Sequence, residues 1–342
     1  ELALTNRFGN LTLRKGEEGV VAIGKPPQKT AVIITSAANV VQWCLYYPGI
    51  LNLDELHLSL EEQQTLAESL TAYRSGDLPG ALAKYPEGRE PSSSGEKIYR
   101  AALLLSVGAA DKSRVLIDSQ STTITSTNAD LKELGAAMKT VIAAVKFQAG
   151  KTGSEKSFNT NSATAWLAES YSQQSQFQLR LALAAARHAT EIAPDFAFAW
   201  SQVAELEFGF GHIREAKSAL DRSLEISPRN AQSIALKGFL LAALNQQKEA
   251  IPVFDAAILA DGALGNGWLG RGLCRIHQGD AEGGRQDLLV AATLEPQRAL
   301  LRSYLGKAFA NLDEPSRAAQ EFILAKELDP HDPTAWRYAA LL

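Results

Sequence analysis

Four of the five tryptophans in this chain are spaced at multiples of one length. Trp166, Trp200, Trp268 and Trp336 are separated by 34, 68 and 68 residues. A fixed period of this size is typical of proteins built from stacked copies of one small helical or strand unit. The spacing therefore restricts the C-terminal half of the chain to a repeat architecture.

Rows of 34 residues, counted from residue 163, place similar residues in the same columns. Residues that stop a helix share a column near the end of the rows, namely Pro194, Pro228, Gly262, Pro296 and Pro330. Small residues share the eighth column, as Ala204, Gly238, Gly272 and Gly306, and the twentieth, as Ala182, Ala216, Ala250, Gly284 and Ala318. Small side chains let two antiparallel helices approach closely, so each row is expected to fold as one helical hairpin.

This pattern resembles the tetratricopeptide repeat family, which has small residues at the eighth, twentieth and twenty-seventh places and proline at the thirty-second. The resemblance covers the last half of the chain. It implies a mainly α protein with a TPR-type right-handed α-solenoid of antiparallel helix pairs. The predicted repeats are 163–196, 197–230, 231–264, 265–298 and 299–332, followed by the first helix of a truncated sixth at 333–342. Glu169 and Gln173 stand where apolar residues are expected, which predicts an irregular first helix in the first repeat.

Residues 1–35 alternate apolar and polar side chains, which is typical of strands. Gly9-Asn10 and the segment from Lys15 to Glu18 interrupt the alternation and indicate turns, giving about three short strands. The segment resembles the last strands of the FecR-type domain, a sensor-associated β module of bacterial envelope proteins. The matching residues are Gly9, Leu11, Leu13, Gly16, Glu17 and Val20.

Three further segments lie between this small β segment and the repeats. Residues 36–58 form an aromatic-rich connection, in which Trp43, Tyr46 and Tyr47 suggest either a packing seam or, less favoured, a ligand site. Residues 59–118 read as degenerate helical hairpins with which the solenoid begins. Residues 119–162 consist of polar tracts that flank one helix, predicted from Asp130 to Gln148.

The residue types that most often serve in catalysis do not form a recognisable catalytic or metal-binding motif in this sequence. Gly150, Lys151 and Thr152 end like a phosphate-binding loop, but Val145 stands where that loop needs glycine. The five histidines show no metal-ligand spacing, and Cys44 and Cys274 are expected to fill core space. We therefore predict no catalytic residues, no cofactor and no metal, and hence no enzyme.

Net charge and hydropathy exclude two classes of partner. With 34 basic and 38 acidic residues, the net charge of -4 gives no electrostatic reason to bind nucleic acid. No stretch of about 18 apolar residues predicts a membrane span in this chain. The chain begins without Met and ends within a repeat, so we expect it to be part of a longer protein.

The family resemblance implies that the second, fifth, ninth, twelfth and thirteenth residues of each first helix face a concave groove that binds protein. The groove residues so predicted are Leu167, Tyr171, Glu205, Phe208, Phe239, Asn266, Leu269, Leu273, Ile276, His277, Ser303, Lys307 and Asn311. Relatives that bind a peptide carboxylate pair Lys with Asn, whereas Lys307 here stands nearly alone, so an amphipathic helix or an extended segment with apolar anchors is the expected occupant. The alternative is that neighbouring helices or residues 119–162 cover these side chains.

Taken together, these features predict a non-catalytic interaction scaffold of the bacterial cell envelope, periplasmic or at the cell surface, that contributes to a larger assembly. The competing prediction is a FecR-like signalling component coupled to an outer-membrane receptor. A third hypothesis is that the repeats are the part of one subunit that contacts other subunits in a complex or filament. All three depend on Trp200, Trp268 and Trp336 occupying equivalent positions along one spiral.

Overall fold

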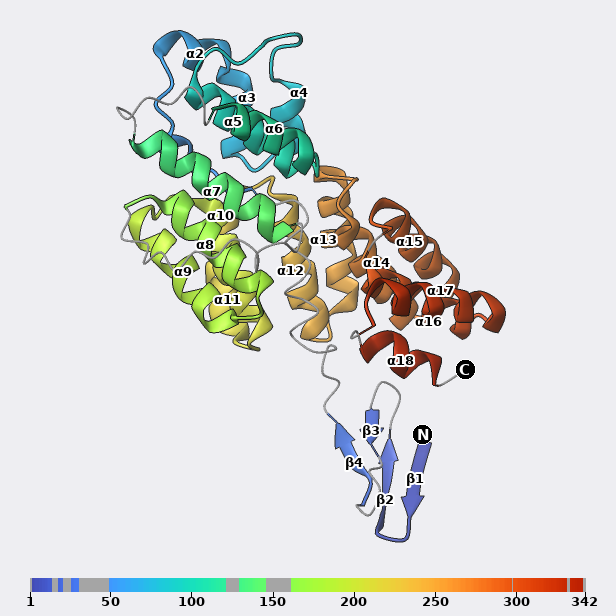
Figure 1. Ribbon diagram of the computed structural model, residues 1–342. Coiled ribbons are helices and arrows are strands. Elements are labelled where there is room, and N and C mark those ends of the chain that lie inside the picture. Colours follow the sequence, from blue (N-terminus) through green and yellow to red (C-terminus); the bar gives the residue numbers. More distant parts are fainter. Residues whose placement is uncertain are drawn as a thin grey trace.

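The computed structural model describes residues 2–13, 18–20, 26–30, 49–120, 129–145, 161–296, 298–330 and 333–340. Helices dominate these residues, and four short strands lie apart from them beyond α18 (Pro333–Ala339) in Figure 1. Trp43, Cys44, Tyr46 and Tyr47, the segment from Gly150 to Thr152 and most of the two polar tracts lie outside the described residues.

Residues 163–340 form a right-handed solenoid of antiparallel helix pairs, as the repeat spacing predicted. The first helices of the pairs are α8 (Ala163–Ser175), α10 (Ala197–Gly209), α12 (Ala231–Ala243), α14 (Gly265–His277) and α16 (Ala299–Asn311). The second helices are α9 (Leu179–Ile192), α11 (Ile213–Ile226), α13 (Gln247–Ala260), α15 (Ala281–Leu294) and α17 (Pro315–Leu328). Equivalent helices begin and end 34 residues apart, and α18 follows as one more first helix.

The turn inside each pair has the same backbone conformation in all five repeats. Its left-handed residues, also 34 apart, are Phe177, Gly211, Asn245, Gly279 and Asp313. In the second repeat the N–H of Gly211 donates to the carbonyl of Phe208, and the N–H of His212 donates to that of Glu207. These two bonds satisfy carbonyls that the end of α10 leaves without helical partners. The repeated turn therefore fixes how each second helix folds back on its first.

The tryptophans occupy equivalent positions along the spiral. The indole N–H of Trp200 donates to the carbonyl of Pro194 at 2.9 Å, that of Trp268 to Gly262 at 2.9 Å, and that of Trp336 to Pro330 at 3.0 Å. Each acceptor lies six residues before its tryptophan. The bond holds the linker that enters each repeat against the first helix.

The small residues lie where the two helices of a pair come closest. A Cβ atom on Gly306 would lie 2.6 Å from the ring of Phe322, and one on Gly272 would lie 2.9 Å from the carbonyl oxygen of Gly284. Real Cβ atoms do not come so close, so a side chain at either of these two glycines would push its pair of helices apart.

Residues 49–120, here named the N-terminal module, precede the solenoid. After a short 3-10 turn (Leu53–Glu55), the module contains α2 (Leu60–Thr65), α3 (Ala67–Arg74), α4 (Leu78–Ala83), α5 (Ser94–Ser106) and α6 (Ala110–Gln120). Gly76 and Gly108 give its two hairpins the same left-handed turn that the repeats use. A single helix, α7 (Ala129–Val145), then lies between the module and α8 (Figure 1).

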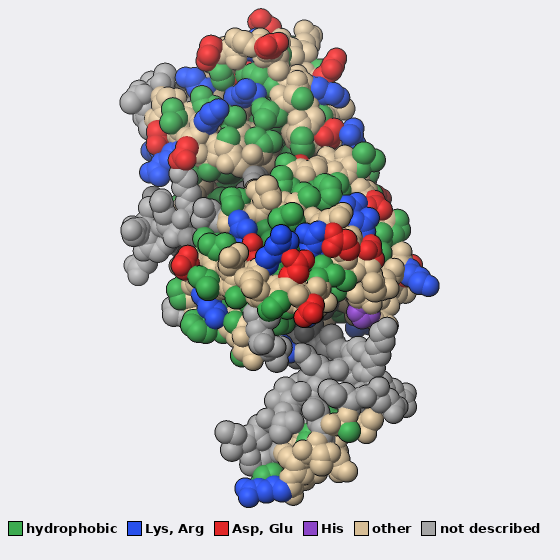
Figure 2. Space-filling model, turned by 90° about the vertical axis from the view of Figure 1, so that its right-hand side faces the viewer, with side chains coloured by type: hydrophobic (Ala, Val, Ile, Leu, Met, Phe, Trp, Pro, Cys, Tyr) green, Lys and Arg blue, Asp and Glu red, His purple; other side chains and the backbone are tan. Residues whose placement is uncertain are grey.

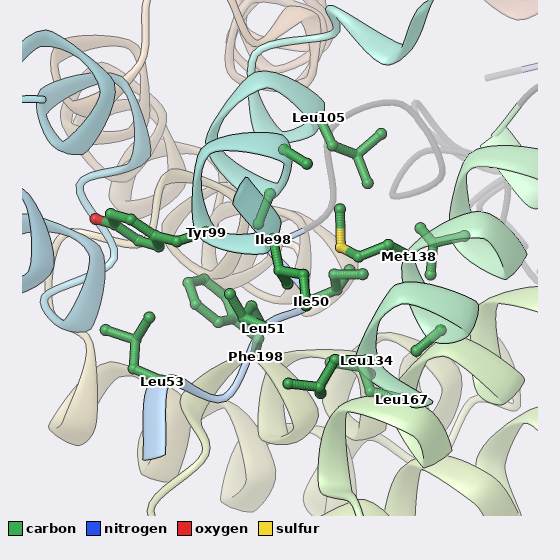
Figure 3. Close-up of a cluster of buried hydrophobic side chains, with 14 of the residues drawn as sticks. Ile50, Leu51, Leu53, Ile98, Tyr99, Leu105, Leu134, Met138, Leu167 and Phe198 are labelled. Atoms are coloured by element: carbon green, nitrogen blue, oxygen red, sulfur yellow. The ribbon is translucent and has the colours of Figure 1, made fainter. Parts of the chain in front are cut away.

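Buried side chains form two hydrophobic clusters. One joins the module, α7, α8 and the start of α10, and Figure 3 shows Leu51, Ile98, Met138, Leu167 and Phe198 converging within it. The other runs through the remaining repeats, from α9 to α17. The first repeat is thus divided between the two clusters.

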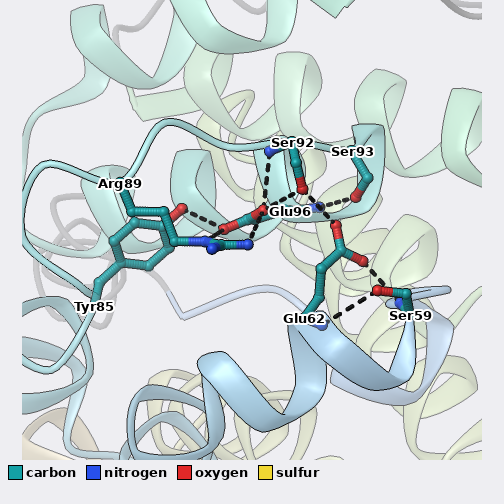
Figure 4. A network of polar contacts seen from close by, with 7 residues as sticks. All are labelled: Ser59, Glu62, Tyr85, Arg89, Ser92, Ser93 and Glu96. Atoms are coloured by element: carbon teal, nitrogen blue, oxygen red, sulfur yellow. Dashed lines mark hydrogen bonds and ion pairs between the residues drawn. The ribbon is translucent and has the colours of Figure 1, made fainter.

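A buried carboxylate organises the module. Glu96 accepts hydrogen bonds from Arg89 Nε at 2.6 Å, the Tyr85 hydroxyl at 2.8 Å and both the N–H and the hydroxyl of Ser92 at 2.9 Å (Figure 4). Burial alone raises the pKa of Glu96, but these donors outweigh it and lower the pKa to about 2. The single hydroxyl proton of Ser92 is shared with Glu62 of α2, whose carboxylate lies 3.1 Å away, and so links α2 to the segment just before α5.

The first helix of the first repeat is regular, and the prediction of an irregular helix was wrong. Residues 163–175 are continuously helical, with Ser162 as the N-cap. Glu169 and Gln173, the residues on which that prediction rested, bond each other one helical turn apart, because the Gln173 amide donates to the Glu169 carboxylate. Gln174, which is buried, donates to Glu205 of α10 at 2.9 Å. The polar side chains of α8 therefore have partners and do not disturb the helix.

The N-terminal strands are β1 (Leu2–Asn6), β2 (Gly9–Leu13), β3 (Glu18–Val20) and β4 (Gln28–Thr30), four where about three were expected. β1 pairs with β2, and β3 with β4, both antiparallel. The first turn lies at Arg7 and Phe8, two residues before the predicted Gly9-Asn10. Asn6 explains the shift, because its side chain accepts the N–H of Phe8 at 2.9 Å and so starts the turn.

Candidate partner-binding surface

The predicted groove residues all lie on the first helices of the repeats, but their exposure changes along the solenoid. Those of the first three repeats are buried, and those of the fourth and fifth include half-buried and exposed side chains. The buried residues are Leu167, Tyr171, Glu205, Phe208, Phe239, Asn266, Leu269 and Ser303. The half-buried ones are Leu273, Ile276 and Lys307, and the exposed ones are His277 and Asn311. The accessible part of the predicted surface is therefore its C-terminal half.

In the first repeat, α7 packs along α8 and explains part of this burial. Leu167 lies in the same cluster as Leu134 and Met138 of α7 (Figure 3). Tyr171 belongs to that cluster as well. Leu167 is therefore a packing residue in this structure.

A ladder of polar side chains joins the first helices of the first three repeats. Gln202 donates to Gln174 at 2.6 Å, and Gln174 donates to Glu205 at 2.9 Å. Ser233 of α12 donates to Ser201 of α10 at 2.9 Å. Sequence reasoning missed Gln174 and Ser201, although they stand at the twelfth and fifth places, the same columns that supplied other groove residues.

The middle of the solenoid combines an apolar contact with an ionic network. Phe239 packs edge-on against Phe254, with ring centroids 4.9 Å apart. On α14, Arg271 binds the nearly buried carboxylate of Asp287 through Nε at 2.9 Å and its terminal nitrogen at 2.7 Å. Arg275 donates to the same carboxylate at 2.9 Å. The network ties α14 to α15 and leaves Leu273 and Ile276 as the apolar side chains beside it.

At the C-terminal end, Lys307 of α16 lies against α18. Its ammonium donates to the hydroxyl of Tyr338 at 3.3 Å and stands 4.6 Å from the centroid of that ring. Burial lowers the pKa of Lys307. Asn266, from the predicted set, accepts from the buried Arg298 at 2.9 Å, so it joins the start of the fourth repeat to that of the fifth.

Two of the hollows among the described residues lie where the module meets α7 and the repeats. One, of about 220 Å³, has an apolar floor that includes Tyr73, Phe196 and Phe198. The other, of about 490 Å³, is lined by His57, Asp130 and Ser162 among others. His57 and Asp130 stand 3.3 Å apart, but the Ser162 hydroxyl donates to Glu55, so its proton is not directed at the imidazole.

Cys274 lies in the interior of the protein and not in a reactive environment. Cys274 is buried, and burial raises the pKa of its thiol to about 11, which keeps it protonated at neutral pH. Within the described parts of the chain, no three His, Cys, Asp or Glu side chains gather in a way that could hold a metal ion. None of the helices among those residues has the length and apolar run required to cross a membrane.

Figure 2 shows the face of the molecule that lies to the right in Figure 1. Lys and Arg side chains alternate there with Asp and Glu, and hydrophobic side chains are interspersed. Charges of both signs at close spacing cancel at a distance, so this face offers no single-sign field for a highly charged polymer.

Comparisons with known proteins find this architecture in solved structures. No protein-family model matches the sequence, and no curated protein matches it. The structure of a Rap protein complexed with Competence and Sporulation Factor aligns with a TM-score of 0.56 and 13% identity, over 69% of this chain and 76% of that one. TTC0263, a thermophilic TPR protein of Thermus thermophilus, aligns with a TM-score of 0.49 and 18% identity, over 53% of this chain and 100% of that one. YrrB, described as a TPR protein with an unusual peptide-binding site, aligns with a TM-score of 0.37 and 20% identity, over 54% of this chain and 94% of that one.

Helix bounds that repeat every 34 residues, a shared left-handed turn and tryptophans with equivalent hydrogen bonds agree with the likeness to the Rap protein structure. The chain therefore has the fold of a tetratricopeptide repeat protein.

Proposed function

We propose that the chain is a non-catalytic scaffold that binds a segment of a partner protein along the first helices of its repeats, as part of a larger assembly. The observation that carries this proposal is that Leu273, Ile276 and His277 on α14 and Asn311 on α16 remain at least partly accessible. Apolar side chains on the same helix face as an imidazole and an amide suit a helix or an extended segment that has apolar anchors.

Burial of two such anchors is enough to matter for binding. Complete burial of a Leu or Ile side chain contributes roughly 1.5 to 3 kcal/mol, and Leu273 and Ile276 are already half-buried, so each has less to gain. The Rap protein, which shares this fold, is described in complex with Competence and Sporulation Factor. In that protein the fold occurs together with a bound partner.

We further propose that the scaffold works in the bacterial envelope, in the periplasm or at the cell surface. The support is the resemblance of residues 1–35 to a FecR-type domain, of which Gly9, Leu11, Leu13 and Val20 lie in strands here. Fractionation of cells that produce the full-length protein tests this location, and recovery in the cytosol alone would contradict it.

The binding surface is tested by replacing Leu273 with Glu. A charge at this half-buried position opposes apolar burial, so we expect proteins captured from an envelope extract, identified by mass spectrometry, to fall at least tenfold. Circular dichroism must show that the variant keeps its helices.

Leu259→Glu is the matched control, because Leu259 lies on α13, a second helix, and is 90% exposed. Capture by this variant should equal that of the unchanged protein. Equal capture by Leu273→Glu would instead remove α14 from the binding surface.

A further inference from the structure

The N-terminal module is tied to the starting points of three successive repeats. The carboxylate of Glu55 accepts the N–H of Ala163 at 2.6 Å and the hydroxyl of Ser162 at 2.8 Å, and so caps α8. The ring of Tyr73 packs edge-on against Phe198 at the start of α10, with centroids 5.3 Å apart. Each tie falls at the first or second residue of its row or immediately before it.

The third tie has the closest contacts, and we name it the clamp. It consists of residues 74–77 of the module and residues 227–230, which form the loop between α11 and α12. The Ser227 hydroxyl donates to the carbonyl of Arg74 at 2.6 Å, and the N–H of Arg229 donates to that of Ser75 at 2.9 Å. The guanidinium of Arg229 lies 3.0 Å from the carboxylate of Asp77.

Gly76 allows this close approach. It has a φ of +84°, and a Cβ atom there would lie 2.6 Å from the backbone nitrogen of Asn230. Any larger residue would therefore both strain the turn and push it off the loop.

An opposing charge lies beside the clamp, on Asp261 at the end of α13. Burial raises the pKa of Asp261, hydrogen bonds from the backbone N–H groups of residues 263 and 264 lower it, and the nearby Asp77 carboxylate adds a smaller rise. Two like charges beside a contact weaken it. The side chain of Arg229, which offsets Asp77, is 61% exposed, so water competes for that pair.

We propose that the clamp is a releasable brace that holds the step between the second and third repeats at one curvature. With α11 and α12 joined by the loop that the module grips, the angle between these repeats cannot change unless residues 74–77 leave it. The module also borders the loop before α14, where Asp261 and Leu264 line a small hollow with Gly76 and Leu78, but the hydrogen bonds and the ion pair of the clamp end at residue 230. The solenoid is thus fixed in its first half and adjustable in its second.

Distances between pairs of nitroxide labels, measured by pulsed electron paramagnetic resonance, test this proposal. Labels replace Arg214 on α11 and Leu259 on α13, which are 93% and 90% exposed, to span the braced step. A second pair, Leu259 and Ser316, spans the repeats beyond it. A third pair, Val115 and Arg214, reports whether the module is docked.

The labels are attached in a background with Cys44→Ser, while Cys274 stays unlabelled because its thiol is buried. Gly76→Leu should lengthen and broaden the Val115 to Arg214 and Arg214 to Leu259 distributions and leave Leu259 to Ser316 unchanged. Gly88→Leu is the control, since Gly88 has a φ of +69° in the same module but nothing within 4 Å of its Cβ position. It should leave all three distributions unchanged.

A second variant, Ser227→Ala with Arg229→Gln, removes the solenoid's side-chain half of the clamp without changing the module. It should broaden the same two distributions to a smaller extent. The brace is disproved if the module undocks while the Arg214 to Leu259 distribution stays as in the unchanged protein. It is equally disproved if neither variant alters any distribution.

Discussion

At the residue scale, the left-handed position of the repeat turn shows how much variety the solenoid tolerates. Glycine occupies it in two repeats, Asn and Asp in two others, and Phe177 in the first. Asn and Asp adopt this conformation more readily than other residues with side chains, whereas an aromatic residue is strained there. Phe177 is also largely exposed, so it gains little from burial in return.

Phe177→Gly should therefore stabilise the first repeat by about 1 kcal/mol, because glycine adopts a positive φ without strain. Urea unfolding followed by circular dichroism measures the change. Gly211→Ala is the reciprocal control: it places a side chain at the same turn position, where a Cβ meets nothing within 4 Å, and should cost about 1 kcal/mol. A destabilised Phe177→Gly variant would show that the aromatic ring makes a favourable contact.

Two glycines of α14, Gly267 and Gly270, serve a different purpose, close approach to α13 of the preceding repeat. A Cβ on Gly270 would clash with the ring of the fully buried Phe254. We expect Gly270→Ala to destabilise the protein by about 2 kcal/mol, although Ala is the better helix former.

Gly135→Ala in α7 is the matched control for that prediction. Its Cβ position has no neighbour within 4 Å, so only the gain in helix propensity remains, about 1 kcal/mol in the opposite direction. Calorimetric melting of both variants decides between packing and propensity: a loss of the same size in both would exclude the clash with Phe254 as the cause.

At the scale of elements, the Glu96 network makes the module sensitive to acid. The pKa of Glu96 is depressed in the folded protein, from 4.5 to about 2, so its contribution is complete above pH 4.5 and disappears as the pH falls toward 2. A shift of this size corresponds to stability on the order of 3 kcal/mol.

Urea unfolding at a series of pH values between 7 and 2 should show this loss, and Glu96→Gln should remove most of it. Glu61→Gln changes an exposed carboxylate in α2 and should leave the pH profile unchanged. A Glu96→Gln profile that falls as steeply as the original would assign the acid sensitivity to other groups.

The helices of the repeats were easier to predict than the contacts that their side chains make with other repeats. The Pro and small-residue columns placed the repeat hairpins because each column reports a contact inside one repeat. The regularity of α8 was missed, since Glu169 and Gln173 looked incompatible with packing, although these two side chains bond each other one helical turn apart. The bond of Gln174 to Glu205 reaches a different repeat, and a single row of sequence does not contain that information.

At the scale of the whole molecule, the two hydrophobic clusters predict two separable units of stability. Leu134→Ala should loosen the module, α7 and α8, whereas Phe322→Ala should loosen the later repeats, each by about 3 kcal/mol because both side chains are fully buried. Hydrogen exchange read by mass spectrometry locates the loss. Exchange that rises equally over both clusters in both variants would mean that the chain unfolds as one unit.

The docking of the module was beyond prediction from sequence for a physical reason. Its ties join residues far apart in the chain, such as Glu55 to Ala163 and Arg74 to Ser227, and the module residues that make them follow no period. The groove prediction rests on family columns, which identify the helix face but do not reveal what else lies against it. The difference in exposure between the first three repeats and the last two appears only in three dimensions.

Trp200, Trp268 and Trp336, whose indole N–H groups bond to backbone carbonyls, are native fluorescent reporters at known positions along the solenoid. When a repeat opens, its indole exchanges a backbone carbonyl for water and its emission shifts to longer wavelength. Variants that keep one of these chromophores and replace the other tryptophans by Phe would reveal whether the spiral frays from its C-terminal tip, where Trp336 is already half exposed, or from within.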